Sequence, residues 1–68
     1  MPDLNSSNLA NAEYDDESRV MTITFRSGST YTYVGVPRET FDQLVASPSP
    51  GSFFYRSIRN RYSYAQEA

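Results

Sequence analysis

The chain has 68 residues, with six arginines against eight acidic residues and a net charge of −2 at neutral pH. This length predicts one small domain, and the acidic balance argues against indiscriminate nucleic-acid binding. Cysteine is absent, which excludes disulfides and thiolate-bound metal, and no apolar run approaches the ~20 residues of a membrane helix. We therefore expect a cytoplasmic protein without a membrane segment.

The chain begins with a polar segment and a weak strand. Residues 1–7 contain Pro2 and are predicted to form a disordered tail. Residues 8–14 are interpreted as a first strand, although the sequence NLANAEY has weak β propensity. Residues 15–18, three of which are acidic, are interpreted as a solvated turn, because the residue spacing and glycine of an EF-hand calcium loop are absent. No metal site is predicted.

Residues 20–25 give the clearest strand signal. Met21, Ile23 and Phe25 alternate with two threonines, which is the period of a half-buried strand. A turn with the sequence RSGS follows, and residues 30–34 are predicted to run back as a third strand.

Two registers are open for this hairpin, and they differ in where Tyr31 and Tyr33 point. A two-residue loop places both tyrosines on the outer face, as an exposed platform for a partner. A three-residue loop over 26–28, with Gly28 in a left-handed conformation, pairs Ile23 with Tyr31 and places both rings in the core. The second register is favoured because it collects the large apolar side chains on one face and the threonines on the other.

Two amphipathic helices are predicted after the strands. Pro37 suits the first position of one helix. Ser47 and Pro48 are predicted to end that helix. Ser49 followed by Pro50 repeats the start signal, with Ser49 as the capping side chain. The predicted apolar stripes are Phe41, Leu44 and Val45 on the first helix and Phe54, Ile58 and Tyr62 on the second.

These elements predict an α+β domain. Its fold is a three-stranded antiparallel meander followed by two short helices packed on the sheet. We expect a single domain over residues 8–63 and a loose C-terminal tail over residues 64–68.

Catalysis is not expected. Histidine and cysteine are both absent, which removes the commonest general base and the commonest activated nucleophile. Glu39 and Asp42 are three residues apart on the exposed side of a predicted helix, a spacing typical of solubilising charge. No phosphate-binding or dinucleotide-binding motif is present, so we expect no cofactor and no small-molecule ligand.

The strongest candidate for a site is the start of the second helix. Ser49 and Gly51 would leave free N–H donors there for an anion. Arg56 and Arg59, on the face opposite the apolar stripe, would add charge-assisted contacts to phosphate. The competing interpretation is ordinary: the serine caps the helix and the arginines stay in water.

A series of residues spread over most of the chain resembles one known family. They are Tyr14, Asp15, Phe25, Gly28, Tyr31, Tyr33, Val36, Pro37, Ala46, Ser49, Gly51, Phe53, Phe54, Ile58, Arg59 and Tyr62. Over residues 6–62 the sequence resembles the KTSC domain, a small bacterial module found alone and at the C-terminus of some lysyl-tRNA synthetases. The resemblance implies no established activity and suggests RNA binding. The chain departs from the family at Tyr55, where Asn is common, and in the proline-stiffened turn at residues 48–50.

Two functions fit the sequence. One is an RNA-binding module, with phosphate at the second helix and a base stacked on an exposed ring such as Tyr55 or Tyr64, or on Tyr31 and Tyr33 if these face outward. The other is a module for a protein partner or a homodimer, which would use the open, threonine-rich sheet face or a sheet edge.

Overall fold

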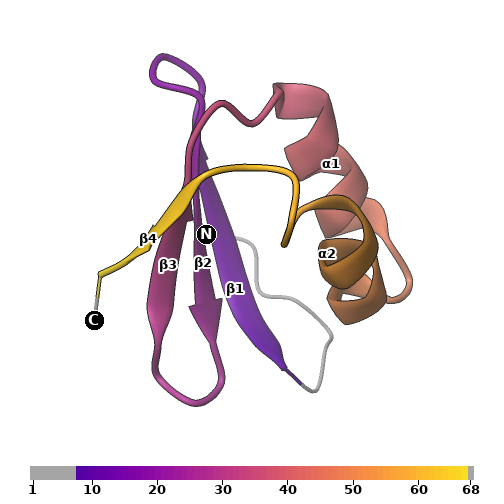
Figure 1. Cartoon of the computed structure of the whole chain (residues 1–68). Coiled ribbons are helices and arrows are strands. Elements are labelled where there is room, and N and C mark those ends of the chain that lie inside the picture. The colour runs from indigo at the N-terminus through magenta and orange to yellow at the C-terminus, as the bar shows by residue number, and fades with distance from the viewer. Residues whose placement is uncertain (1–7, 68) are drawn as a thin grey trace.

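The fold is an antiparallel sheet with two helices. The structure, a computed structural model, describes residues 8–67. Its elements in chain order are β1 (Leu9–Asp15), β2 (Val20–Phe25), β3 (Thr30–Tyr33), α1 (Arg38–Ala46), α2 (Pro50–Ser57) and β4 (Tyr64–Gln66) (Figure 1). The strands lie in the sheet in chain order, and each pair is antiparallel. The predicted α+β fold is confirmed, with a fourth strand added. The tail predicted over residues 1–7 lies outside the described residues.

The β2–β3 hairpin has the favoured register. Ile23 lies opposite Tyr31, and Met21 lies opposite Tyr33. The tight loop depends on Gly28, whose φ of +101° is a conformation that residues with a side chain rarely adopt. Both tyrosines therefore lie on the face of the sheet that carries the large apolar side chains.

Residues 64–66 form an edge strand, so the prediction of a loose tail over residues 64–68 is wrong for this segment. Tyr64 lies opposite Tyr33. On either side of β4, the Val34 N–H donates to the Ser63 carbonyl oxygen at 3.0 Å, and the Glu67 N–H donates to the Thr30 carbonyl oxygen at 2.7 Å. All three residues of β4 are exposed. The sequence of such a strand does not alternate between buried and exposed residues, so it cannot be recognised from the pattern. The strand forms because the edge of β3 offers hydrogen-bond partners to its backbone.

Helix α1 begins one residue later than predicted. Pro37 is the N-cap residue, with an extended backbone, and Arg38 is the first helical residue. Phe41 and Leu44 are buried, as the stripe predicts. Val45 is 37% exposed, so the buried stripe is narrower than predicted.

Helix α2 starts at Pro50 as predicted, but the predicted cap is wrong. The side chain of Ser49 makes no capping hydrogen bond. The Ser49 N–H instead donates to Ser47 Oγ at 3.1 Å, which uses a side chain before the helix to hold the turn. The helix ends at Ser57, so Arg59 lies beyond it and not on the helix face where the sequence predicted it.

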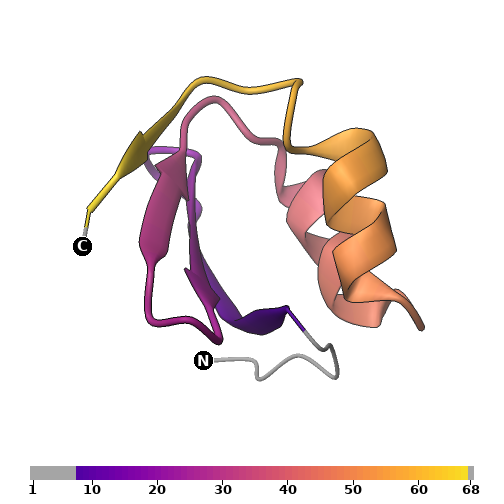
Figure 2. The same ribbon diagram turned by 60° about the horizontal axis from the view of Figure 1, so that its bottom comes forward.

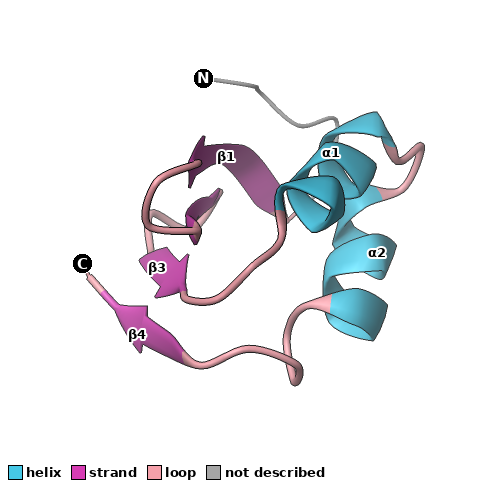
Figure 3. Cartoon of the chain, turned by 90° about the horizontal axis from the view of Figure 1, so that it is seen from above, coloured by secondary structure: helices cyan, strands magenta, loops and turns pink. Residues whose placement is uncertain are grey.

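Both helices cover the same face of the sheet, and the core lies between the two layers (Figure 2). Figure 3 shows the sheet curving beside the helix pair. Within residues 8–67, no helix is long and apolar enough to cross a membrane. The buried core residues are Leu9, Ala12, Met21, Ile23, Tyr33, Val36, Phe41, Leu44, Phe54 and Ile58.

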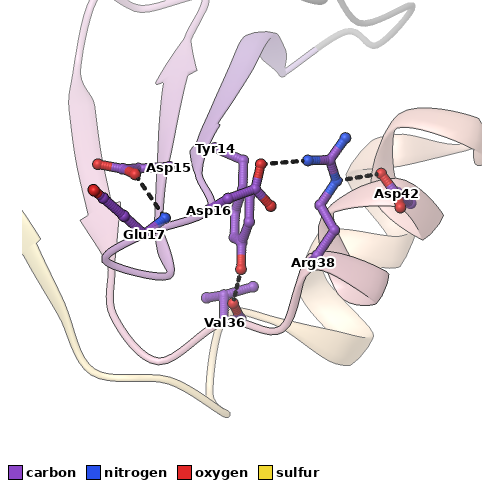
Figure 4. Close-up of polar contacts among 7 residues, drawn as sticks. All are labelled: Tyr14, Asp15, Asp16, Glu17, Val36, Arg38 and Asp42. Carbon is purple, nitrogen blue, oxygen red and sulfur yellow. Dashed lines mark hydrogen bonds and ion pairs between the residues drawn. The ribbon is translucent and has the colours of Figure 1, made fainter.

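A polar cluster ties the β1–β2 turn to α1 (Figure 4). The Arg38 guanidinium forms ion pairs with Asp16 (2.7 Å) and Asp42 (3.0 Å), and it lies 5.8 Å from the centroid of the Tyr14 ring. The hydrogen bonds that Arg38 donates to these two carboxylates raise the pKa of the guanidinium, and the bond to Asp42 is the larger cause. The Tyr14 hydroxyl donates to the backbone carbonyl oxygen of Val36, the residue two positions before the arginine.

Candidate nucleic-acid interface

An open groove of about 700 Å³ lies between the β3–β4 half of the sheet and the C-terminal part of α2. It exists because the helices cover the sheet unevenly. Helix α1 packs on β1, whereas β4 forms the opposite edge of the sheet, away from the helices, in both Figure 2 and Figure 3. Half of the groove lining is aromatic, namely Phe25, Tyr31, Tyr33, Phe54, Tyr55 and Tyr64.

The rings form a buried floor and an exposed rim. Tyr33 and Phe54 are each 3% exposed and meet edge to face at 5.6 Å between ring centroids. The Tyr64 ring lies 5.8 Å from Tyr31 and 5.7 Å from Tyr33, yet Tyr64 remains 60% exposed. Tyr55, on α2, is 48% exposed. The floor therefore belongs to the core, and the rim offers aromatic surface to a ligand.

The charge of the groove is opposite to that of the chain. Among the described residues that line it are Arg26 and Arg59, and none of them is acidic. The Arg59 guanidinium carbon lies 5.1 Å from the centroid of the Tyr55 ring, within the range of a cation–π contact. A positively charged, aromatic groove thus occurs in a protein whose net charge is −2.

The hydroxyl of Tyr33 is held neutral in the floor. The pKa of Tyr33 is raised to about 12, chiefly by burial and further by the neighbouring Tyr31 and Tyr64 hydroxyls, while Arg59 opposes the shift. The hydroxyl therefore stays protonated to a higher pH than that of an ordinary tyrosine and keeps both its donor and its acceptor capacity there.

The structure brings together four of the residues predicted from the sequence. Tyr31, Tyr33, Tyr55 and Arg59 all line the groove. The favoured register is confirmed, yet it does not remove Tyr31 from reach of a ligand, because Tyr31 is only half-buried at the uncovered side of the sheet.

The remaining predicted residues lie elsewhere. Ser49, Gly51 and Arg56 are not among the lining residues. The Nε of Arg56 donates to the carbonyl oxygen of Ser52, one turn back along α2, at 3.3 Å. The helix start and the groove are therefore two different candidate surfaces, and Arg59 belongs to the groove.

Five polar lining residues have no counterpart among the predicted site residues, namely Asn8, Arg26, Ser27, Ser29 and Asn60. The sequence could have indicated Arg26, because the three-residue loop places it directly after Phe25, at the end of the aromatic face of the hairpin. Asn60 follows α2 in a turn, and its position depends on where the helix ends, which the sequence pattern does not mark.

Comparison with known proteins identifies the family. The sequence model of the KTSC domain matches residues 5–62. This chain belongs to the KTSC domain family. The resemblance noted from the sequence is thereby confirmed.

Relatives of this KTSC domain include small proteins and parts of much larger ones. A protein of Tsukamurella paurometabola is 36% identical over 62 residues, which cover 91% of this chain and 92% of that protein. The lysine–tRNA ligase of Trichormus variabilis is 34% identical over 53 residues, which cover 78% of this chain but 9% of the ligase. The crystal structure of a KTSC domain protein from Yersinia pestis superposes with a TM-score of 0.91 at 30% identity, covering 97% of this chain and 93% of that one.

Proposed function

We propose that this KTSC domain is a non-enzymatic module that binds RNA in the groove between β3–β4 and α2. The observation that carries the proposal is the composition of the groove, which joins four tyrosines to two arginines and includes no carboxylate. Aromatic rings stack on bases, and arginine binds phosphate through a planar fork of donors. The same groove therefore meets both chemical parts of a nucleotide.

Arg59 is the expected phosphate-binding residue. It lies in the turn after α2, and its contact with the Tyr55 ring orients the guanidinium at the side of the groove. An arginine held in this way loses less conformational entropy on binding than one free in solvent. Arg26, in the β2–β3 loop, also lines the groove.

The start of α2 is the competing position for an anion. Ser49 and Gly51 lie there, and Arg56 is on the same helix, outside the groove. Binding at that start would depend on Arg56, whereas binding in the groove would not. This difference makes Arg56 the matched control for Arg59.

The relatives support RNA over other polyanions. A lysine–tRNA ligase, which by its name acts on tRNA, carries a segment 34% identical to this chain. A domain of the same family that acts beside tRNA would work in the cytoplasm, and we propose that location here.

The test is a two-dimensional amide NMR titration with tRNA at low salt, repeated at high salt. We expect shifts at the groove residues, and we expect salt to erase them because phosphate contacts release counterions. Arg59→Gln should weaken binding about tenfold, as expected for one charge-assisted hydrogen bond. It should also lower the slope of log affinity against log salt by about 0.7, as for one single-strand phosphate contact.

Arg56→Gln should change neither quantity. If Arg56→Gln weakens binding and Arg59→Gln does not, the anion lies at the helix start and the groove proposal is wrong. If tRNA shifts no amide of the folded domain, RNA binding itself is wrong.

A second candidate function is association through the outer face of the sheet. Thr22, Thr24, Thr30 and Thr32 lie on the face opposite the helices, which no described element covers in Figure 2. A protein partner or a second copy of the chain would fit such a surface or the β4 edge. Sedimentation at increasing concentration tests the homodimer, and a mass that stays monomeric contradicts it.

A further inference from the structure

We propose that the groove takes an unpaired RNA segment and that Tyr64, on β4, is its principal base-stacking residue. This inference rests on the proposed RNA-binding function and specifies which form of RNA the groove accepts.

Tyr64 combines exposure with support, as a stacking platform requires. Tyr64 is 60% exposed, whereas Tyr55 is 48% exposed. The rings of Tyr31 and Tyr33 contact it at 5.8 and 5.7 Å between centroids and hold it from the side of the sheet. The ring therefore keeps free aromatic surface while its orientation is fixed by neighbours.

The backbone of β4 fixes the ring further. Residues on both sides of the strand are hydrogen-bonded to the β3 segment, from the Val34 N–H to Ser63 O at 3.0 Å and from the Glu67 N–H to Thr30 O at 2.7 Å. The Thr32 hydroxyl also reaches the Ala65 carbonyl oxygen at 3.4 Å. A short strand tied at both ends presents its tyrosine at little entropic cost on binding.

The aromatic lining favours unpaired RNA over duplex RNA. In an A-form duplex the base faces are stacked on one another, and proteins reach mainly riboses and phosphates. The exposed rings of the groove, Tyr55 and Tyr64, would find no free base face there. A volume of about 700 Å³ falls in the range of roughly 300–1,000 Å³ that ligand pockets of small molecules occupy. The volume suits one or two bases that are unstacked from the RNA strand. Arg59 would then contact the phosphate next to them.

The experiment is fluorescence anisotropy of the full chain with a labelled oligoadenylate and with a blunt duplex RNA of equal length. We expect the single strand to bind at least tenfold more tightly than the duplex. Tyr64→Leu should weaken single-strand binding about fivefold to hundredfold, the usual range for one lost base–aromatic stack. Tyr64→Phe and Tyr64→Trp should keep it within about twofold, because a ring remains to stack on the base.

Amide spectra of each variant show whether β4 still pairs with β3, and the Phe and Trp variants keep the test valid if the Leu variant loses that pairing. Equal affinity for single strand and duplex overturns the inference, as does an unchanged affinity in Tyr64→Leu. A loss in Tyr64→Phe as large as in Tyr64→Leu overturns it too, since the hydroxyl and not the ring would be responsible. If tRNA binding persists and depends on Arg59 while Tyr64→Leu is neutral, only this inference fails. If the unmodified chain binds neither RNA, both proposals fail.

Discussion

Two arginine–aromatic clusters in this domain differ in what faces the arginine. At the β1–β2 turn, Arg38 lies near the ring of Tyr14 and forms ion pairs with Asp16 and Asp42. In the groove, Arg59 lies near the ring of Tyr55, and among residues 8–67 no carboxylate pairs with it. The first cluster satisfies its own charge, and the second presents its charge to the groove.

The comparison shows that an arginine beside a ring does not by itself indicate a binding site. Cation–π contacts of this kind are common in folded proteins and stabilise them modestly. Charge pairing separates the two cases. Arg38 uses both of its acidic partners to tie a turn to a helix, while Arg59 remains available to a phosphate.

The largest expected effect concerns the floor that the groove shares with the core. Phe54 is 3% exposed, and its ring meets Phe25 and Tyr33 edge to face, each at 5.6 Å. Phe54→Ala should lower the free energy of unfolding by about 3–5 kcal/mol, as for other buried phenylalanines. A chain of this length is stable by only about 3–10 kcal/mol. Urea unfolding should therefore show a variant that is unfolded or nearly so.

The rim supplies the control for the floor. Tyr64→Leu should lower the free energy of unfolding by less than about 1 kcal/mol, because most of the side chain is already in solvent. Similar losses in the two variants would mean that the groove has no separate rim and that β4 is part of the core.

The next effect is a loss of stability at alkaline pH. The pKa of Tyr33 is raised to about 12 in the folded protein, against an ordinary value of about 10. Because the folded state holds this proton more tightly, the stabilisation is complete below about pH 10 and is lost as the pH rises towards 12. The loss should reach roughly 2 kcal/mol.

Urea unfolding of the unmodified chain and of Tyr33→Phe at a series of pH values measures this loss. The variant cannot ionise at this position, so its stability should fall less over the same range. Parallel curves for the two proteins would contradict the assignment of the raised pKa to Tyr33. The difference in tyrosinate absorbance between the folded unmodified chain and folded Tyr33→Phe checks the same pKa, because the chain has six tyrosines.

The sequence predicted the parts of the fold that follow from local periodicity. The alternation of Met21, Ile23 and Phe25 located β2, and segregation of apolar side chains from threonines selected the register that the structure confirms. Both signals work because one face of the sheet is buried, so that a shift by one residue would expose every core side chain.

The sequence did not predict features that depend on how far one element extends over another. The groove exists because α2 ends at Ser57 and the helices do not extend over β4. β4 has three exposed residues and no periodicity, so nothing in its own sequence distinguishes it from a tail. The Ser49 side chain makes no capping hydrogen bond, and Ser47 Oγ accepts only from the Ser49 N–H, which precedes the helix.

The smallest effect tests the comparison of the two arginines directly. Arg38→Gln should lower the urea midpoint, because it removes the ion pairs to Asp16 and Asp42. These pairs are exposed, so the loss should be much smaller than that of Phe54→Ala and should shrink as salt screens them.

Arg38→Gln should leave tRNA affinity unchanged. Arg59→Gln should do the reverse and weaken tRNA binding with little change in the urea midpoint. If Arg38→Gln weakens tRNA binding as much as Arg59→Gln does, charge pairing does not distinguish the two clusters, and binding follows the total charge of the domain.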